Sequence, residues 1–203
     1  TKGWQPLSEI AVGEKIAVPS QLEIFGTTML PECEVKLLGY WLGKKNLRQK
    51  PPKFFQLSPL IKNDFLKALL QFDDQPSTAD FMDIRLRRAS YRGFLDLEET
   101  IVIPPIIFTL VRSQVALFLN RHFAVSGKTQ VSPMGIPSIS YSSRSETLTK
   151  SVQHLLLRFG ILASLTRSKT RLPIWRLTIS DMPSLQTFIN EIGIFSKQLA
   201  LSQ

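Results

Sequence analysis

An internal duplication most constrains what this chain can fold into. Two stretches, residues 32–43 and residues 113–124, are apolar on nearly every side of a helix, which is typical of helices that are buried on most faces. Gly39 and Gly43 lie four residues apart on one face of the first stretch, and each costs about 1 kcal/mol relative to alanine in a helix interior. We interpret them as the place where a partner helix approaches closely, although Gly43 is also compatible with a helix end.

The segments that follow the two apolar helices also correspond. Residues 60–72 and 148–159 both have the pattern of an amphipathic helix, and both end in Leu-Leu, a polar residue and Phe. The repeat distance is 87 residues at the closing phenylalanines and 82 residues just past the ends of the apolar helices. Near-equal distances predict two copies of one unit that differ slightly in length.

Strand patterns complete the expected unit. They occur at 136–142, 161–166 and 174–179, and a closing helix is expected at 181–192. The order of helix, strands, helix and strands therefore occurs twice. This order predicts an α+β protein with two sheets, one in each half.

The charge is strongly basic and uneven. The 203 residues carry a net charge of +9 and a pI of about 9.9. Residues 1–100 have 14 Lys/Arg and 13 Asp/Glu, whereas residues 101–203 have 11 Lys/Arg and only 3 Asp/Glu. The second half therefore favours a polyanionic partner. Charge alone does not separate DNA, RNA and an anionic membrane, and a basic surface that only solvates the protein remains an alternative.

Several classes of protein are disfavoured by composition. No apolar run reaches the roughly 18 residues that a membrane helix needs. A single cysteine, Cys33, excludes an internal disulfide and a cysteine zinc cluster, and two histidines make a histidine metal site unfavourable. A hydrolytic set of Ser126, His122 and Asp181 has no supporting sequence context.

Two motifs carry a resemblance to a known family. Residues 37–43 (LLGYWLG) resemble the first signature helix of the LAGLIDADG, or DOD-type, homing endonucleases, and residues 118–127 (FLNRHFAVSG) resemble the second. The resemblance implies two pseudo-symmetric αββαββα-like halves that form one saddle-shaped DNA-binding domain. Residues 1–19 resemble the part of an intein splicing domain that leads into such an insert. The whole chain is most similar to the insert in a replicative DNA helicase intein of the cyanobacterial type.

The resemblance implies a domain organisation in four parts. We expect a remnant of the splicing (Hint) domain at 1–20, a linker at 21–32, the first LAGLIDADG repeat at 33–103 and the second at 104–203.

The family's catalytic acids are replaced in this sequence. In the family each signature helix ends in a carboxylate, and the two carboxylates share divalent cations such as Mg²⁺. Lys44 occupies the first of these positions, followed by Lys45 in place of a glycine, and Ser126 occupies the second. An ammonium group repels Mg²⁺ and a hydroxyl is a weak neutral ligand. We therefore expect no metal-ligand residue, no cofactor although the family uses Mg²⁺, and loss of double-strand cleavage.

Other positions follow from the same resemblance. Arg121 and Val125 stand at the expected helix interface with Gly39 and Gly43, where larger side chains are expected to spread the two helices. The sheet of the family lies along the DNA major groove with alternate side chains facing the duplex. The expected DNA-binding residues are Arg144, Arg167, Lys169, Arg171 and Arg176.

The functional hypothesis is a degenerate homing endonuclease domain of an intein that keeps its fold and binds double-stranded DNA. Alternatives are a structural intein insert without DNA function, a non-catalytic LAGLIDADG DNA-binding protein, a nuclease with a displaced metal site, and an unrelated basic regulator. The expected partners are double-stranded DNA, the rest of the parent intein and its host protein, without a membrane. We expect a cytoplasmic monomer.

Overall fold

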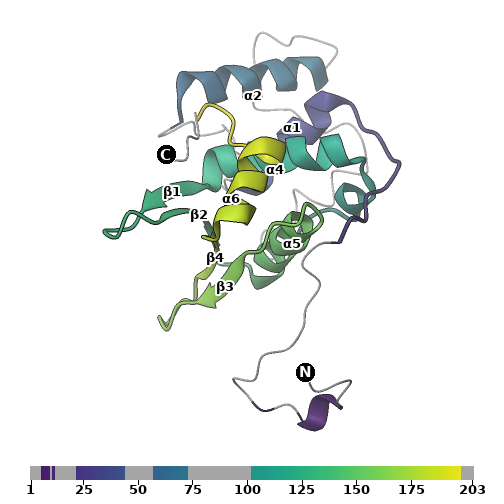
Figure 1. Cartoon of the computed structure of the whole chain (residues 1–203). Helices are drawn as coiled ribbons and strands as arrows, with labels where there is room; N and C mark the ends of the chain where they lie inside the picture. Colours follow the sequence, from purple (N-terminus) through teal and green to yellow (C-terminus); the bar gives the residue numbers. More distant parts are fainter. Residues whose placement is uncertain (1–5, 10, 12–21, 44–56, 73–101, 198–203) are drawn as a thin grey trace.

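The computed structural model describes residues 6–9, 11, 22–43, 57–72 and 102–197 (Figure 1). These residues form helices around a central helix pair, with a four-stranded sheet on one side of it. A short helical turn, η1 (Leu7–Glu9), lies apart from the main body in Figure 1. The α+β class expected from the sequence is confirmed. None of the helices in the described part of the chain is long and apolar enough to cross a membrane.

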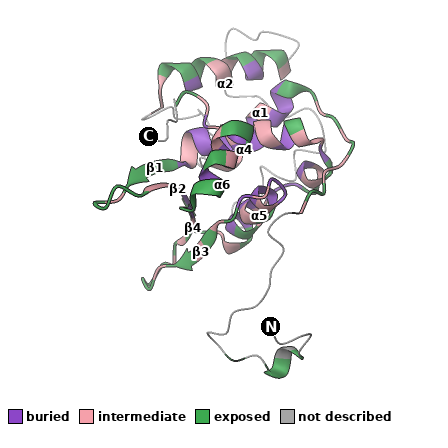
Figure 2. Cartoon of the chain, viewed as in Figure 1, coloured by how far each residue is buried: buried purple, intermediate pink, exposed green. Residues whose placement is uncertain are grey.

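The central pair consists of α1 (Glu32–Gly43) and α4 (Arg112–Ser126), which lie side by side. Both are largely buried, as Figure 2 shows. Helix α1 has the bounds predicted from its apolar pattern, and α4 is slightly longer than predicted. Gly127 ends α4 with an extended backbone, and its N–H donates to the Phe123 carbonyl. The prediction of two buried apolar helices is confirmed.

Helix α2 (Pro59–Phe72) packs along α1 through one apolar stripe. The stripe has helical spacing and consists of Ile61, Phe65, Ala68 and Leu69, all buried. The Phe65 ring meets Tyr40 and Trp41 of α1 edge to face, at centroid distances of 5.8 and 6.4 Å. Tertiary packing therefore fixes α2 on the side of α1.

The sheet has the strand order β1-β2-β4-β3, and every neighbouring pair is antiparallel. The strands are β1 (Lys128–Val131), β2 (Pro137–Ser143), β3 (Ser164–Arg167) and β4 (Trp175–Ile179). The sequence predicted β2, β3 and β4 to within about three residues but did not predict β1. One face is apolar and buried, with Ile139, Tyr141, Leu177 and Ile179.

Helices pack against this apolar face. Helix α5 (Glu146–Leu157) contacts β2 and β4, and its first turn is capped by the Ser145 hydroxyl, which accepts from the Leu148 N–H. The chain closes with α6 (Met182–Thr187) and the π-helical turn η4 (Phe188–Ile192). Phe123 of α4 joins the layers, because its ring lies 5.0 Å from Phe188 and 6.1 Å from Tyr141.

The described part of the lead-in to α1, residues 22–31, is packed against the helices. The Leu22 N–H donates to the Leu157 carbonyl, and Thr28 pairs with Leu110. Gln114 bonds both backbone groups of Leu30, accepting from its N–H and donating to its carbonyl. The turn η3 (Pro105–Thr109) precedes α4 and closes this region.

The order α1, α2 in the first half corresponds to α4, α5 in the second. The strands expected for the first half fall on residues 44–56 and 73–101, which lie outside the described residues. The described part of the chain therefore contains one complete unit of the expected order, in the second half. The division into repeats at 33–103 and 104–203 remains a prediction.

Candidate nucleic-acid interface

Helices α1 and α4 approach so closely at Gly39 that no side chain fits there. A Cβ atom at Gly39 would lie 2.7 Å from the Phe118 carbonyl oxygen and 2.9 Å from the Arg121 Cβ. A Cβ atom at Gly43 would lie 2.5 Å from the Val125 Cγ2 and 2.7 Å from the His122 carbonyl oxygen. The structure thus brings Gly39, Gly43, Arg121 and Val125 together, with the α1 backbone against α4.

Arg121 does not spread the two helices, because its side chain leaves the interface. The Arg121 Nε donates to Asp64 of α2 at 2.8 Å, and its guanidinium lies 3.9 Å from the centre of the Phe195 ring. The Tyr40 hydroxyl donates to the same carboxylate oxygen at 2.7 Å, and the Lys36 ammonium lies 3.4 Å from the other oxygen. These residues form a polar node that joins α1, α2 and α4.

The node favours the charged form of Asp64. Burial raises the pKa of the Asp64 carboxyl, but hydrogen bonds from Arg121 and Tyr40 and the charges of Arg121 and Lys36 outweigh it. The pKa of Asp64 therefore lies below its ordinary value. Burial and the neighbouring carboxylate raise the pKa of Tyr40, so its hydroxyl remains protonated and donates.

His122 lies fully buried in the same interface, among aromatic rings. Its ring lies 4.8 Å from the Tyr141 ring and 5.9 Å from the Phe118 ring. Burial lowers its pKa to about 4, and the nearby Gly39 carbonyl offsets this only in part. Neither ring nitrogen has a hydrogen-bond partner with acceptable geometry among the described residues. The ring is therefore neutral at pH 7 and acts as a packed side chain.

The C-terminal end of α4 carries no carboxylate. The Ser126 hydroxyl donates to the His122 carbonyl at 2.6 Å, within its own helix. The Lys197 ammonium donates to the carbonyl of the next residue, Gly127, at 3.0 Å. Lys44 and Lys45, at the corresponding end of α1, lie outside the described residues.

The second face of the sheet is polar and open. Strand register determines its members, since directly paired residues point to the same side of a sheet. They are Lys128, Gln130, Ser138, Ser140, Ser142, Ser164, Thr166, Arg176 and Thr178. Only Ser140, in the middle strands, is buried. This face offers hydrogen-bond donors and acceptors and two positive charges to solvent.

The five expected DNA-binding residues are all exposed, and the register gathers them at one end of the sheet. Arg176 projects from the polar face, opposite Ser142 and Thr166. Lys169 and Arg171 lie in the turn between β3 and β4, and Arg144 directly follows β2.

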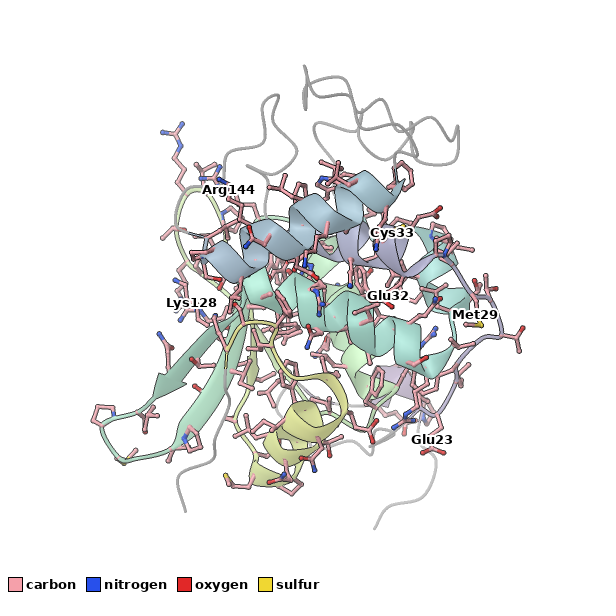
Figure 3. All side chains as sticks on the ribbon, turned by 90° about the horizontal axis from the view of Figure 1, so that it is seen from above. Glu23, Met29, Glu32, Cys33, Lys128 and Arg144 are labelled. Atoms are coloured by element: carbon pink, nitrogen blue, oxygen red, sulfur yellow. The ribbon has the colours of Figure 1, made fainter. Side chains whose placement is uncertain are left out.

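Arg167 differs from the other four, because it pairs with Trp175 on the opposite face and its guanidinium lies 5.6 Å from the centre of the Trp175 ring. None of the five forms a salt bridge with a described acidic residue. Figure 3 shows Arg144 and Lys128 on one side of the molecule, with Glu23 and Met29 on the other.

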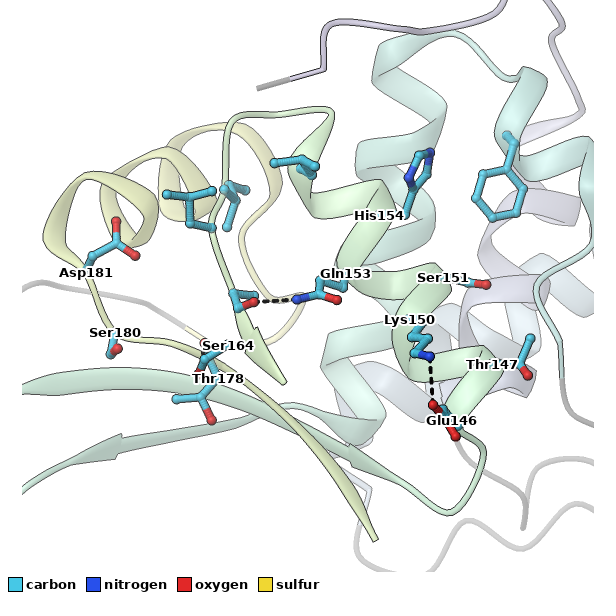
Figure 4. Close-up of a pocket in the computed structure, with 15 residues that line it drawn as sticks. Glu146, Thr147, Lys150, Ser151, Gln153, His154, Ser164, Thr178, Ser180 and Asp181 are labelled. Carbon is cyan, nitrogen blue, oxygen red and sulfur yellow. Dashed lines mark hydrogen bonds and ion pairs between the residues drawn. The ribbon is translucent and has the colours of Figure 1, made fainter. Parts of the chain in front are cut away.

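A groove of about 1060 Å³ lies beside α5 (Figure 4). Its walls include Phe108, Leu157 and Ile161, and an ion pair between Lys150 and Glu146 at 2.7 Å lies on its rim. None of the residues expected from the sequence to bind DNA or to replace the catalytic acids lines this groove. Ser164 and Thr178 of the polar sheet face also line it, so the groove borders the candidate interface.

Three charged residues of this region were not singled out from the sequence. Asp64 and Lys197 acquire their roles from partners 57 and 70 residues away. Lys128 follows Gly127 directly and begins an exposed edge strand. Of these three residues, only Lys128 could have been recognised from the sequence, because it is a basic residue immediately after the second signature motif.

Comparison with known families finds a match in the second half of the chain. Residues 113–193 match the family described as LAGLIDADG-like domain. The matched range begins inside α4 and ends just after η4, so it covers the unit of helices and sheet described above. Residues 113–193 are thus similar to a LAGLIDADG-like domain, as the motif at 118–127 indicated.

The similar proteins are much longer than this chain. It is 25% identical to the replicative DNA helicase DnaB of Synechocystis sp., over 96% of this chain and 26% of that protein. It is 24% identical to the replicative DNA helicase DnaB of Rhodothermus marinus, over 95% of this chain and 23% of that protein. A shorter match, 34% identical over 46% of this chain, is to 9% of the glutamine–fructose-6-phosphate aminotransferase of Methanocaldococcus jannaschii. The chain thus spans about a quarter of the length of the two helicases.

The expectation that this chain needs no cofactor is wrong, because the family matched by residues 113–193 is one of metal-dependent nucleases. The described end of α4 nevertheless does not fit a divalent cation. Its hydroxyl is neutral and donates to its own helix, and the Lys197 ammonium contacts the carbonyl of the next residue. No cluster of three or more His, Cys, Asp or Glu side chains within the described ranges could hold a metal ion.

Proposed function

We propose that this chain is the DOD-type homing endonuclease domain of an intein. It binds double-stranded DNA as a cytoplasmic monomer, and it has lost the ability to cut both strands. The observation that carries the proposal is the open polar sheet face, with Arg176 on it and Lys169, Arg171 and Arg144 at its end. Alternating polar side chains on a sheet face can read base edges in the major groove, and flanking cations can contact phosphates.

The relatives support an inserted element. The chain is similar to a part of two replicative helicases and, over a shorter length, to a small part of an aminotransferase. Their names describe unrelated activities, so neither the helicase activity nor the aminotransferase activity explains the shared segment. A mobile insert that is carried by different host proteins accounts for this distribution. The division into residues 1–20, 21–32, 33–103 and 104–203 belongs to the same proposal.

Loss of cleavage follows from the ends of the two central helices. Hydrolysis in this family depends on one carboxylate from each helix. Ser126 supplies a hydroxyl that is already hydrogen-bonded to the His122 carbonyl, and Lys44 supplies an ammonium group in sequence. Neither group can take the role of a carboxylate.

The test compares two duplexes over several salt concentrations. One carries the uninterrupted insertion site of the host gene, and the other has the same composition in scrambled order. We expect tighter binding to the insertion site and no double-strand cleavage of either duplex in Mg²⁺. Equal binding to both duplexes with a steep salt dependence would contradict specific recognition. Cleavage by the unaltered chain would contradict the loss of activity.

A restored variant separates the DNA-binding hypothesis from that of a purely structural insert. Lys44→Asp, Lys45→Gly and Ser126→Asp together return the carboxylates and the glycine of the family motif. Specific cleavage by this variant supports a domain that keeps its DNA-reading face. A folded variant that neither binds nor cuts supports a structural insert.

A further inference from the structure

The C-terminal segment after η4 brings a lysine to the end of α4. The Asn120 amide of α4 donates to the Ile192 carbonyl at 2.7 Å, and the Phe195 ring lies against the Arg121 guanidinium. Two residues later, the Lys197 ammonium donates to the Gly127 carbonyl at 3.0 Å. The segment is thus held along α4 at three points, and Lys197 is positioned by packing.

The Lys197 ammonium is available to a ligand. An ammonium group has three hydrogen-bond donors, and the Gly127 carbonyl uses one. The residue is exposed, and it forms no salt bridge with an acidic side chain of the described residues. Burial of part of the side chain lowers its pKa, and no carboxylate within the described ranges compensates for this. Two donors of a partly desolvated cation therefore remain for an anion.

A second lysine lies at the same corner of the molecule. Lys128 follows Gly127 directly, begins β1 and projects from the polar face of the sheet, paired with Ser140. It is exposed and has no ion pair with a described residue. Lys197 thus contacts the carbonyl of the residue directly before Lys128, where the open sheet face meets the end of α4. This is a corner of uncompensated positive charge beside the surface that we propose for DNA.

We propose that Lys197 contacts a backbone phosphate of duplex DNA at the C-terminal end of α4, with Lys128 beside it. This inference rests on the proposed DNA-binding function and extends it to a residue outside the matched family range, which ends at residue 193. An ammonium group that keeps one bond to the protein and directs the others outward is a point contact for a phosphodiester. Such a contact positions the duplex and carries no base specificity.

The experiment measures the salt dependence of DNA affinity in the full chain. Lys197→Gln keeps a donor for the Gly127 carbonyl and removes the charge. Lys197→Arg keeps both the hydrogen-bond donor and the positive charge. Lys67→Gln, on the exposed surface of α2, removes the same charge from a different element. Unfolding in urea is measured in parallel for each variant.

We expect the slope of log affinity against log salt concentration to fall in magnitude by about 0.9 in Lys197→Gln, the value for one lost phosphate contact. Lys197→Arg and Lys67→Gln should keep the wild-type slope. An unchanged slope in Lys197→Gln, with or without lower stability, would overturn this inference, because it is the result expected of a helix cap. An equal change in Lys67→Gln would overturn it too. Wild-type protein that does not bind DNA would overturn the proposed function itself.

Discussion

Arg121 of α4 and Asp64 of α2 form a 2.8 Å hydrogen-bonded ion pair with about one tenth of the Arg121 side chain and 16% of the Asp64 side chain exposed. The pair explains how an arginine is accommodated where two helix backbones meet. Its guanidinium is directed away from α1 to a third helix, where Tyr40 and Lys36 complete the partners of the carboxylate. Helix α2 therefore stabilises the central pair by satisfying the one charge that α4 brings to it near Gly39.

Removing the carboxylate tests this node. Asp64→Ala leaves the Arg121 charge and the Tyr40 hydroxyl without their partner, and we expect the free energy of unfolding to fall by about 3 kcal/mol. Glu146→Ala is the control, since Glu146 pairs with Lys150 on the exposed surface of α5 and should change stability by about 0.5 kcal/mol or less. Urea unfolding of both variants gives the comparison. If Asp64→Ala lowered the free energy of unfolding no more than Glu146→Ala, water would be able to replace the hydrogen bonds of Asp64.

The pH dependence of stability should report on His122. In the folded chain its pKa is about 4, whereas an unfolded histidine has a pKa of about 6.5. The unfolded state therefore binds more protons below pH 6.5, and stability is lost as the pH falls from about 6.5 towards about 4. The loss from this group amounts to about 3 kcal/mol.

Two variants isolate this contribution, because the chain has only two histidines. His122→Leu fills a similar volume without unpartnered nitrogens, and its stability should change much less between pH 6.5 and pH 4. His154→Gln, on the exposed side of α5, should keep most of the wild-type dependence. Urea unfolding at several pH values measures both. A His122→Leu variant with the full wild-type loss would rule out His122 as its source.

The sequence predicted the parts of the fold that depend on local periodicity. The apolar run at 32–43 became α1 with the same bounds, because nearly all of its faces are covered. Strand β1 was not predicted, because all four of its residues are exposed on an edge strand. Its sequence therefore has no alternation of apolar and polar residues. The roles of Asp64 and Lys197 could not be predicted, since each depends on a partner that only tertiary packing brings near.

In the candidate interface, too, some features could be predicted from the sequence and others depend on tertiary structure. Basic residues on and between strands could be recognised from the sequence, but their faces depend on the register of β2, β3 and β4. Arg167 and Arg176 are both basic strand residues, yet they project to opposite sides. Lys44, which follows the last residue of α1, lies outside the described residues, so its role stays a prediction.

Replacing Gly39 by alanine tests the close approach of the helices through the sign of the change in stability. Helix propensity alone predicts that the free energy of unfolding rises by about 1 kcal/mol. The added Cβ would lie 2.7 Å from a backbone oxygen of α4, which cannot move without separating the helices. Overpacking of this kind costs about 1–3 kcal/mol. We therefore expect the free energy of unfolding to fall in Gly39→Ala, and a rise in urea unfolding experiments would contradict the close approach.

The two faces of the hairpin that β3 and β4 form predict different effects on DNA binding. Arg176 projects from the open polar face, whereas Arg167 pairs with Trp175 on the other side and lies over its ring. If the polar face lies along the duplex, Arg176→Gln should lower the salt slope of DNA affinity by about 0.9 and weaken binding. Arg167→Gln removes the same charge from the neighbouring strand and should have a smaller effect, since its guanidinium is already engaged by the indole. Titrations of a duplex at several salt concentrations compare the two variants directly. A larger effect at Arg167 than at Arg176 would mean that the duplex does not lie on the face that the strand register leaves open.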